Sequence, residues 1–234
     1  YSSELGAVIA RGREAGVEKC VVTGTNMETS RQAVELARKY PGVIYAAVGT
    51  HPEDWRDGGP TRSDLEGAVA IGEIGMDAST EELSSHMEEQ KQLFGVQCEL
   101  AVELDLPIIV HTRESLVEAL EVLDGLSKMP KGQFHCFSHD ENGVKQVLDR
   151  GFYISFCGNI SWSKRVRRLV PLVPDDKLLL ETDSPLMAPE PHAGERNEPA
   201  NVRITAQIIA RERGVTLEEL ASQTTENARK LFNI

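Results

Sequence analysis

The sequence predicts an α/β fold, namely a (β/α)8 TIM barrel, and three observations support this class. Short apolar runs alternate with helix-like segments along the chain. The runs are almost continuously apolar, which is typical of parallel strands that helices cover on both faces. Four of the runs end in a carboxylate or imidazole side chain, at Glu73, His111, His135 and Asp183. Because the strands of a parallel barrel end on one face, where catalytic groups collect, these four side chains are expected to converge.

Strand-like and helix-like segments follow one another without a break in the pattern. The strand-like runs occupy residues 19–25, 43–52, 68–77, 107–112, 133–138, 152–158 and 177–184. Segments with helical periodicity occupy residues 3–16, 28–40, 81–105, 115–126, 140–151 and 198–214. Thr216 opens T-L-E-E, a capping box that begins a last helix running towards Leu231. This order predicts successive βαβ units within a single domain over residues 1–234.

The seven strand-like runs are one fewer than the barrel needs, and the chain opens on a helix. We therefore expect the natural protein to have a segment before Tyr1 that supplies a first strand. The structural alternative is an open, doubly wound sheet. The closed ring is favoured because the polar strand ends are spread over four different strands.

Hydrophobic residues make up 40% and charged residues 26% of the 234 positions, as in ordinary globular proteins. No apolar stretch approaches the roughly 20 residues that span a membrane, and no signal peptide is visible. We expect a cytoplasmic protein that has no membrane contact and needs no stable protein partner. In that setting the four cysteines, at positions 20, 98, 136 and 157, are expected to be reduced core residues rather than a disulfide framework.

The formal net charge of -12 argues against a protein that coats duplex DNA, because such binding needs many lysine and arginine contacts. The charge does not exclude an enzyme that acts on nucleic acid, since divalent cations offset a cluster of carboxylates. The basic stretch at residues 163–168 is interpreted as a solvated helix face, with a local phosphate guide as the alternative.

Carboxylates and imidazoles together suit Zn²⁺, Mn²⁺, Co²⁺ or Mg²⁺ as ligands. Such cations lower the pKa of water and neutralise charge on the oxygens of a phosphodiester, which is what its hydrolysis requires. Glu73 could bridge two cations through its two oxygens, and Asp183 could accept the proton of the attacking water. Each residue alone could be an ion-paired or hydrogen-bonded core group, but four such positions together favour a metal site.

Two arginines are candidates for binding substrate. Arg113 follows His111 by two residues, and its planar guanidinium suits a phosphate. The alternative for Arg113 is an ion pair with Glu114 or Asp140. Arg196 lies in the loop after the last strand-like run, where barrels often bind phosphate, or else it fixes that loop through a salt bridge.

Two further histidines are also assigned to substrate contact. His51 ends a strand-like run, and a turn before Pro52 is an equally good explanation for it. His139 is interpreted as a loop residue that touches substrate rather than as a metal ligand. Asp77 either caps the loop after its strand or orients a group that lies behind the metal ligands, and the sequence favours neither.

The motifs VGTHP, GEIGMD, VHTRE, FHCFSH, ETDSP, RNEPA and TTENARKLF resemble the TatD family of metal-dependent deoxyribonucleases, in order along the chain. The resemblance implies an amidohydrolase-type barrel with one or two divalent cations and DNA as substrate. It makes Glu73 a ligand shared by two cations, His111 and His135 imidazole ligands, and Asp183 the carboxylate beside the catalytic water. The chain lacks the D-x-H-x-H motif of the family's first strand, whose histidines bind metal.

Three functions are therefore open at this stage. The first is a metal-dependent deoxyribonuclease that acts on single strands or ends, with Asp183 and Glu73 as its catalytic residues. The second is a carbonyl hydrolase, such as an aminoacyl-tRNA deacylase, because amidohydrolase-type sites also cleave esters and amides. The third is a catalytically impaired metal-binding protein, which the absence of H-x-H would explain.

Overall fold

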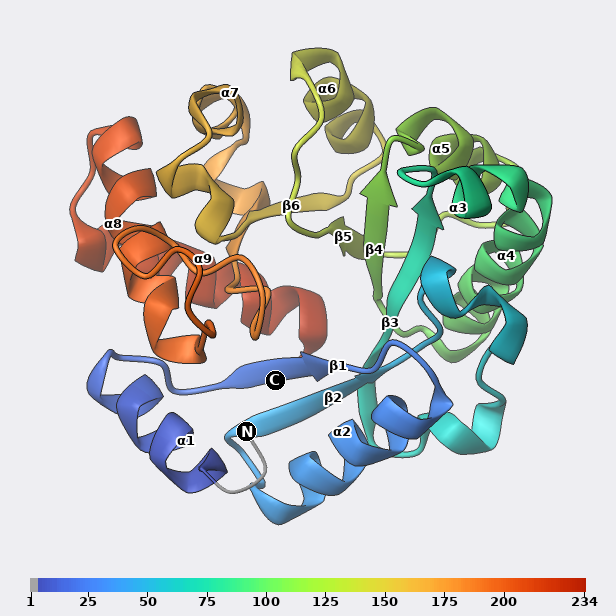
Figure 1. Cartoon of the computed structure of the whole chain (residues 1–234), viewed down its shortest axis with the longest axis horizontal. Coiled ribbons are helices and arrows are strands. Elements are labelled where there is room, and N and C mark those ends of the chain that lie inside the picture. The colour runs from blue at the N-terminus through green and yellow to red at the C-terminus, as the bar shows by residue number, and fades with distance from the viewer. Residues whose placement is uncertain (1–3) are drawn as a thin grey trace. The chain divides into compact units, whose positions relative to one another are not determined.

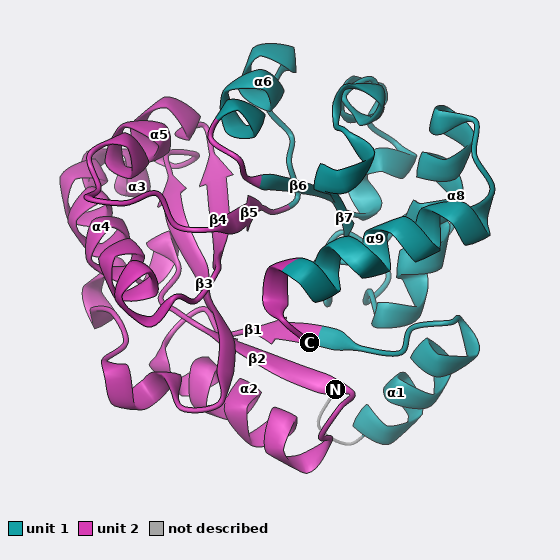
Figure 2. Ribbon diagram, turned by 180° about the vertical axis from the view of Figure 1, so that it is seen from behind, with its two compact units in different colours: residues 1–20, 136–149, 153–230 teal, residues 21–135, 150–152, 231–234 magenta. Residues whose placement is uncertain are grey.

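The computed structural model describes residues 4–234 and shows strands alternating with helices (Figure 1). Ser3, the first residue of the expected opening helix, lies outside the described residues. Contacts between Cα atoms divide the chain into two compact units, coloured separately in Figure 2. Unit 1 comprises residues 1–20, 136–149 and 153–230, and unit 2 comprises residues 21–135, 150–152 and 231–234. The single domain expected from the sequence stays a prediction.

Unit 2 is built on parallel strands that follow the order of the sequence. They are β1 (Cys20–Thr23, entering the unit at Val21), β2 (Ile44–Val48), β3 (Ala68–Asp77), β4 (Ile108–Arg113) and β5 (Gly132–Phe134). The register pairs Gly75 with His111, and Val110 with Phe134. Parallel pairing in this register brings the C-terminal ends of β3, β4 and β5 to one edge. His111 lies near the end of β4 and His135 follows β5 directly, whereas Glu73 lies in the middle of β3 and not at its end as the sequence predicted.

Helices connect the strands of unit 2, as the alternating pattern predicts. They are α2 (Met27–Lys39), η1 (Pro52–Asp57), η2 (Arg62–Leu65), α3 (Glu81–Ser85), α4 (Met87–Leu104) and α5 (Leu116–Asp124). The single helix expected over residues 81–105 is broken at His86, whose ψ of 31° is not helical. The Gln90 side chain accepts from the backbone N–H of Asp77 at 2.8 Å and donates to the carbonyl of Leu83 at 2.8 Å. The first of these hydrogen bonds ties α4 to the end of β3, and the second satisfies a carbonyl of α3 near the break, and local periodicity reveals neither.

Unit 1 contains the parallel pair β6 (Tyr153–Phe156) and β7 (Leu178–Leu180). Its helices are α1 (Leu5–Glu14), α6 (Glu141–Asp149), η3 (Gly158–Ser161), α7 (Lys164–Arg167), η4 (Val170–Leu172), η5 (Asp175–Lys177), η6 (Pro199–Asn201), α8 (Val202–Arg213) and α9 (Leu217–Phe232, within the unit as far as Lys230). The capping box of α9 is confirmed: the Thr216 hydroxyl accepts from the Glu219 N–H at 3.1 Å, and the Glu219 carboxylate accepts from the Thr216 N–H at 2.9 Å. The strand expected over residues 177–184 ends at Leu180, so Asp183 lies in the loop that follows.

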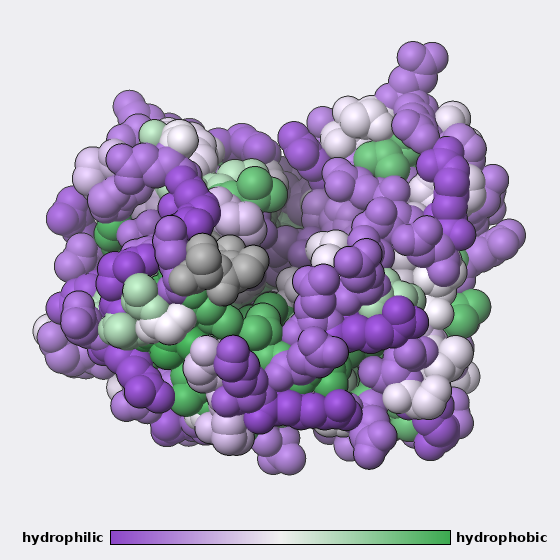
Figure 3. All heavy atoms as spheres, turned by 60° about the horizontal axis from the view of Figure 1, so that its bottom comes forward, coloured by the Kyte–Doolittle hydropathy of each residue, from purple (hydrophilic) through white to green (hydrophobic). Residues whose placement is uncertain are grey.

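The strands of each unit pack into an apolar interior. Ile71, Ile74 and Phe94 are completely buried in unit 2, as are Ile154 and Phe156 in unit 1. The face drawn in Figure 3 is mostly hydrophilic, in keeping with the charged composition. Within residues 4–234, no helix combines the length and apolar character needed to cross a membrane.

Candidate metal centre

Glycine on both sides of Glu73 lets β3 lie unusually close to β4. A Cβ atom added at Gly72 would stand 2.6 Å from Cβ of Ile109, and one added at Gly75 would stand 2.0 Å from the carbonyl oxygen of His111. Gly75 also has a φ of +142°, which residues with a side chain rarely adopt. The G-E-I-G sequence is therefore explained by the close approach of the two strands that carry Glu73 and His111.

We expect Gly75→Ala to destabilise the protein by at least about 2–3 kcal/mol, through the unfavourable φ together with the collision against the backbone. Chemical denaturation monitored by circular dichroism measures the change. Gly42→Ala is the matched control, because Gly42 also has a positive φ (+76°) but open space around its Cβ position. An equal loss of unfolding free energy in the two variants would show that the close packing of β3 against β4 does not contribute to the cost of a side chain at Gly75.

Three imidazole nitrogens surround one oxygen of the Glu73 carboxylate. Oε1 lies 2.7 Å from Nε2 of His135, 3.2 Å from Nδ1 of His111 and 3.4 Å from Nε2 of His51. The Glu73 side chain is only 12% exposed, and all four residues belong to unit 2. Burial acts to raise the pKa of Glu73, but the charge of His135 and hydrogen bonds from the three histidines hold that pKa well below its usual value. Glu73 is thus a buried carboxylate kept ionised by imidazoles.

Asp77 caps the loop after β3, which was one of the two sequence interpretations, and it also contacts the ring of His111. Its Oδ2 lies 2.9 Å from Nε2 of His111, while its Oδ1 accepts from the backbone N–H of Ser79 at 2.7 Å. Burial would raise the pKa of Asp77, but His111 and Ser79 lower it to about 2. Carboxylates face both ring nitrogens of His111, Asp77 at Nε2 and Glu73 at Nδ1, so the ring is fixed in one orientation. A cation beside Glu73 would replace the proton between His111 Nδ1 and the Glu73 oxygen.

His51 is placed beside Glu73 but is arranged as a donor. Its Nδ1 accepts the backbone N–H of Glu53 at 3.2 Å, which caps η1. In the neutral ring the proton then resides on Nε2, the nitrogen that faces Glu73. The ligand atoms of His51, Glu73 and His111 lie within 4.8 Å of one another, so the spacing alone would also suit a cation. The tautomer instead favours His51 as a hydrogen-bond donor to Glu73, and its contact with substrate stays a prediction.

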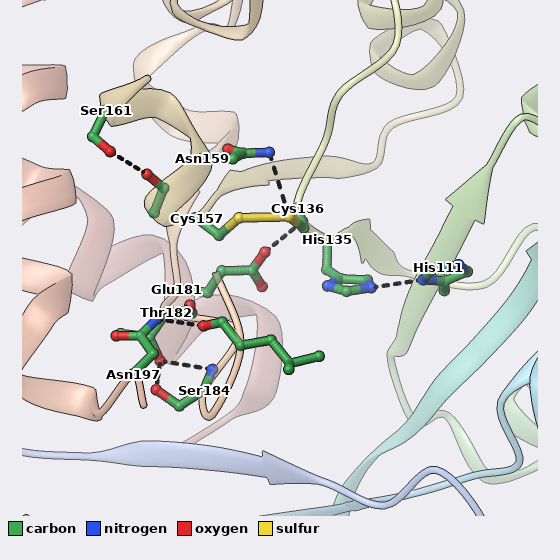
Figure 4. Close-up of a disulfide and its surroundings, with 12 residues drawn as sticks. His111, His135, Cys136, Cys157, Asn159, Ser161, Glu181, Thr182, Ser184 and Asn197 are labelled. Atoms are coloured by element: carbon green, nitrogen blue, oxygen red, sulfur yellow. Dashed lines mark hydrogen bonds between the residues drawn. A yellow bond between two sulfur atoms is a disulfide. The ribbon is translucent and has the colours of Figure 1, made fainter. Parts of the chain in front are cut away.

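In unit 1, Asp183 lies on a turn that Asn197 holds in place. Its neighbours Thr182 and Ser184 are labelled beside Asn197 in Figure 4. Asp183 has a φ of +57°, a left-handed conformation that Asp and Asn tolerate better than most residues. The fully buried Asn197 donates through Nδ2 to the carbonyls of Thr182 and Leu186, each at 2.7 Å. Its own N–H bonds to the carbonyl of Pro185 at 3.0 Å. Sequence reasoning did not single out Asn197, although it belongs to the distinctive RNEPA motif.

Cys136 and Cys157 form a disulfide next to Asp183 in unit 1 (Figure 4). The expectation that all four cysteines are reduced is wrong for this pair, because chain folding brings their Cα atoms to 5.2 Å although 21 positions separate them. Cys20 and Cys98 are free thiols, and burial raises the pKa of both. Glu181 was also missed: its carboxylate accepts the backbone N–H of Cys136.

The remaining predicted residues lie on loops or at strand ends. Arg113 ends β4 with an exposed side chain, and within residues 4–234 it has no ion pair with Glu114 or Asp140. The His139 ring contacts the Phe137 ring at 5.2 Å between centroids. Arg196 forms a salt bridge with Glu4 at 2.7 Å, as expected if Arg196 fixes its loop rather than binding phosphate. Substrate contact stays a prediction for all three.

Comparisons with known proteins show which family the chain belongs to. A family model described as "TatD related DNase" matches residues 1–233. The chain belongs to the TatD family. It is 37% identical to the "uncharacterized metal-dependent hydrolase YabD" of Bacillus subtilis (strain 168), covering 100% of this chain and 94% of that protein. It is 38% identical to the "3'-5' ssDNA/RNA exonuclease TatD" of Citrobacter rodentium (strain ICC168), covering 97% of this chain and 91% of that protein.

Among solved structures, YJJV, a TatD homologue from Escherichia coli k12, matches with a TM-score of 0.90 and 27% identity, covering 100% of this chain and 93% of that one. The predicted TIM-barrel fold class and the TatD resemblance are both confirmed, and the chain is a metal-dependent hydrolase of this family. The described residues contain seven parallel strands. The structure brings Glu73, His111 and His135 together, whereas Asp183 is in unit 1 and its membership of the metal site stays a prediction.

Proposed function

We propose that this TatD-family protein is a divalent-metal-dependent nuclease that hydrolyses phosphodiester bonds of single-stranded DNA or of DNA ends. The observation that carries the proposal is the buried Glu73 carboxylate with His111 and His135 nitrogens 3.2 and 2.7 Å from one of its oxygens. A buried carboxylate among imidazoles is costly in apolar surroundings and useful when a cation binds. The relative from Citrobacter rodentium, which carries the name of a 3'-5' ssDNA/RNA exonuclease, supports the substrate class.

The donor set fits a divalent cation. Glu73, His111 and His135 offer one oxygen and two nitrogens, a mixture that suits Zn²⁺, Mn²⁺, Co²⁺ or Mg²⁺. One or two such cations would lower the pKa of water and offset negative charge on the phosphate oxygens. The low pKa of Glu73 means that its carboxylate is ionised and ready to bind at neutral pH. Asp77 fixes the ring of His111, so little rotational freedom is lost when that ring binds.

The remaining roles are assigned from chemistry and from the matched motifs. Asp183 accepts the proton of the attacking water, and the water oxygen forms the new bond to phosphorus. The bond from phosphorus to the oxygen of the leaving nucleotide breaks, and that oxygen takes up a proton from Asp183 or from solvent. The loop of Asp183 is held by the buried Asn197, which fixes the backbone on both sides of Asp183. Arg113 has an exposed side chain at the end of β4, where a guanidinium could pair with a substrate phosphate in two hydrogen bonds.

We expect Asp77→Asn to lower metal affinity by about 10–100-fold, as is typical when a group that orients a ligand is lost. The asparagine keeps the size of the side chain but removes the charge that holds the Nε2 proton of His111 in place. Isothermal titration of the metal-free protein with Mn²⁺ or Zn²⁺ measures the affinity. Asp64→Asn is the matched control: Asp64 caps η2 and lies away from the imidazole cluster, so it should not affect metal binding. An unchanged affinity in Asp77→Asn would remove Asp77 from the site.

An end-labelled oligonucleotide assay tests the activity itself. The chain is incubated with a 5'-labelled single strand and each of Mg²⁺, Mn²⁺, Co²⁺ and Zn²⁺, with a chelator as the metal-removal control. We expect products that shorten from the 3' end, and we expect the chelator or a phosphorothioate at the 3' terminus to stop them. RNA and duplex DNA in parallel reactions define the substrate range, and the four cations define the preferred metal.

The main alternative is a carbonyl hydrolase, which amidohydrolase-type chemistry also allows. An activated ester and an aminoacyl-tRNA, tested with the same four cations, separate the two functions. Metal-dependent cleavage of the ester or the aminoacyl bond, with the oligonucleotides left intact, would replace the nuclease proposal. Cation binding without hydrolysis of any of these substrates would identify a metal-binding protein that lacks catalysis.

A further inference from the structure

A second group of potential ligands lies in unit 1 and consists of two sulfurs and one carboxylate. The Sγ atoms of Cys136 and Cys157 and a carboxylate oxygen of Asp183 all lie within 4.8 Å of one another. Cys157 is completely buried, and Cys136 and Asp183 are half-buried. None of these atoms belongs to the imidazole cluster around Glu73, and sulfur is a much softer donor than the oxygen and nitrogen atoms found there.

Several contacts fix the two sulfurs on their loops (Figure 4). Cys136 has a φ of +42°, and the Glu181 carboxylate binds its backbone N–H. Cys157 immediately precedes η3 and is its N-cap. These backbone restraints do not involve the sulfur–sulfur bond, so they persist when that bond is broken.

Asn159 packs its side-chain amide against the sulfurs. Its Nδ2 donates to Sγ of Cys136 at 3.7 Å, which places the amide beside the sulfurs. Its Oδ1 is buried and has no hydrogen-bond partner within the described part of the chain, and the residue is only 9% exposed. The nitrogen is therefore the atom of the amide that faces the sulfurs, and the oxygen lies on the other side of the amide (Figure 4).

We propose that reduction of the Cys136–Cys157 disulfide opens a second cation site, in which the two thiolates and Asp183 bind a thiophilic divalent cation such as Zn²⁺ or Cd²⁺. Two molecules of a small thiol supply the two electrons and two protons that convert the disulfide into two thiols, and they leave as their own disulfide. Both thiols then release their protons to solvent as the cation binds. In the disulfide state the sulfurs have no thiolate charge to offer, so the oxidised protein does not bind the cation there.

Cadmium titration tests the site directly, because cadmium–thiolate bonds absorb in the ultraviolet. The titration uses the Glu73→Gln variant, which lacks the central carboxylate of the imidazole cluster. The result therefore does not depend on whether the proposed metal centre at Glu73 is correct. Protein reduced with a small thiol and then freed of it should gain this absorbance with a stoichiometry of one cation, whereas oxidised protein should gain none. Cys157→Ser should abolish the two-thiolate signal, and Cys98→Ser, which changes a buried thiol outside the group, should retain it.

Thiol protection provides a second measurement that does not require the Cys157 variant to fold. Reduced protein is alkylated with and without Cd²⁺, and each cysteine is then quantified by peptide mass spectrometry. We expect Cd²⁺ to protect Cys136 and Cys157 together from alkylation. We expect Asp183→Asn to lower the affinity for Cd²⁺, measured by this protection, at least about tenfold. A loss of this size is typical even of groups that only orient a metal ligand. Equal alkylation of both cysteines with and without Cd²⁺ would overturn the proposal, as would a cadmium signal that survives in Cys157→Ser.

Discussion

Glu73→Gln is expected to lower nuclease turnover by about 10³-fold or more and to reduce the amount of metal that copurifies or binds. Loss of the central anionic ligand removes several kcal/mol of charge stabilisation, and each 1.36 kcal/mol corresponds to a factor of about ten in rate. The amide has nearly the same shape, and its oxygen can still accept hydrogen bonds from the surrounding imidazoles. We therefore expect the fold to survive, since the substitution also removes the cost of burying a charge.

The measurement combines initial rates on a single-stranded oligonucleotide with metal content by mass spectrometry. Glu66→Gln is the matched control, because Glu66 is exposed and its substitution makes the same change in net charge. The control should keep full activity and metal content. If Glu73→Gln keeps the metal content and turnover of the unmodified chain, Glu73 is not the central ligand of the site.

Asp183→Asn is expected to lower turnover by about 10²-fold or more, in line with the usual contribution of a general base. Asparagine cannot accept the proton of the attacking water, yet it matches aspartate in size. It also tolerates the left-handed backbone at this position, where φ is +57°, so the turn should remain intact. The expected defect is therefore in the chemical step rather than in folding.

Single-turnover rates at saturating metal, together with the thermal unfolding midpoint, separate these two effects. Asp176→Asn provides the control, since Asp176 is an exposed aspartate in η5 of the same unit. We expect both variants to unfold near the temperature of the unmodified chain. A turnover for Asp183→Asn equal to that of the control would contradict the assigned role, whatever its stability.

The alternation of apolar runs with helical periodicity was sufficient to predict the parallel strands, because burial on both faces leaves so clear a pattern. The ends of the elements were less well predicted. The expected strand over residues 177–184 stops at Leu180, and the expected helix over residues 81–105 breaks at His86. In the second case the buried Gln90 bonds to groups outside its own helix, and such contacts lie beyond what a local pattern encodes.

The sequence by itself determined the ligand types of the candidate metal centre, because residue identity is a local property. It misplaced Glu73, which lies in the middle of β3 rather than at its end, and Asp183, which lies in the loop after β7. It could not decide which atoms meet. The parallel register pairs Gly75 with His111, Asp77 fixes the ring of His111, and the Glu53 N–H sets His51 as a donor. It also could not show that Cys136 and Cys157, 21 positions apart, stand side by side. Those arrangements depend on packing between segments distant in the chain, and only the tertiary structure specifies that packing.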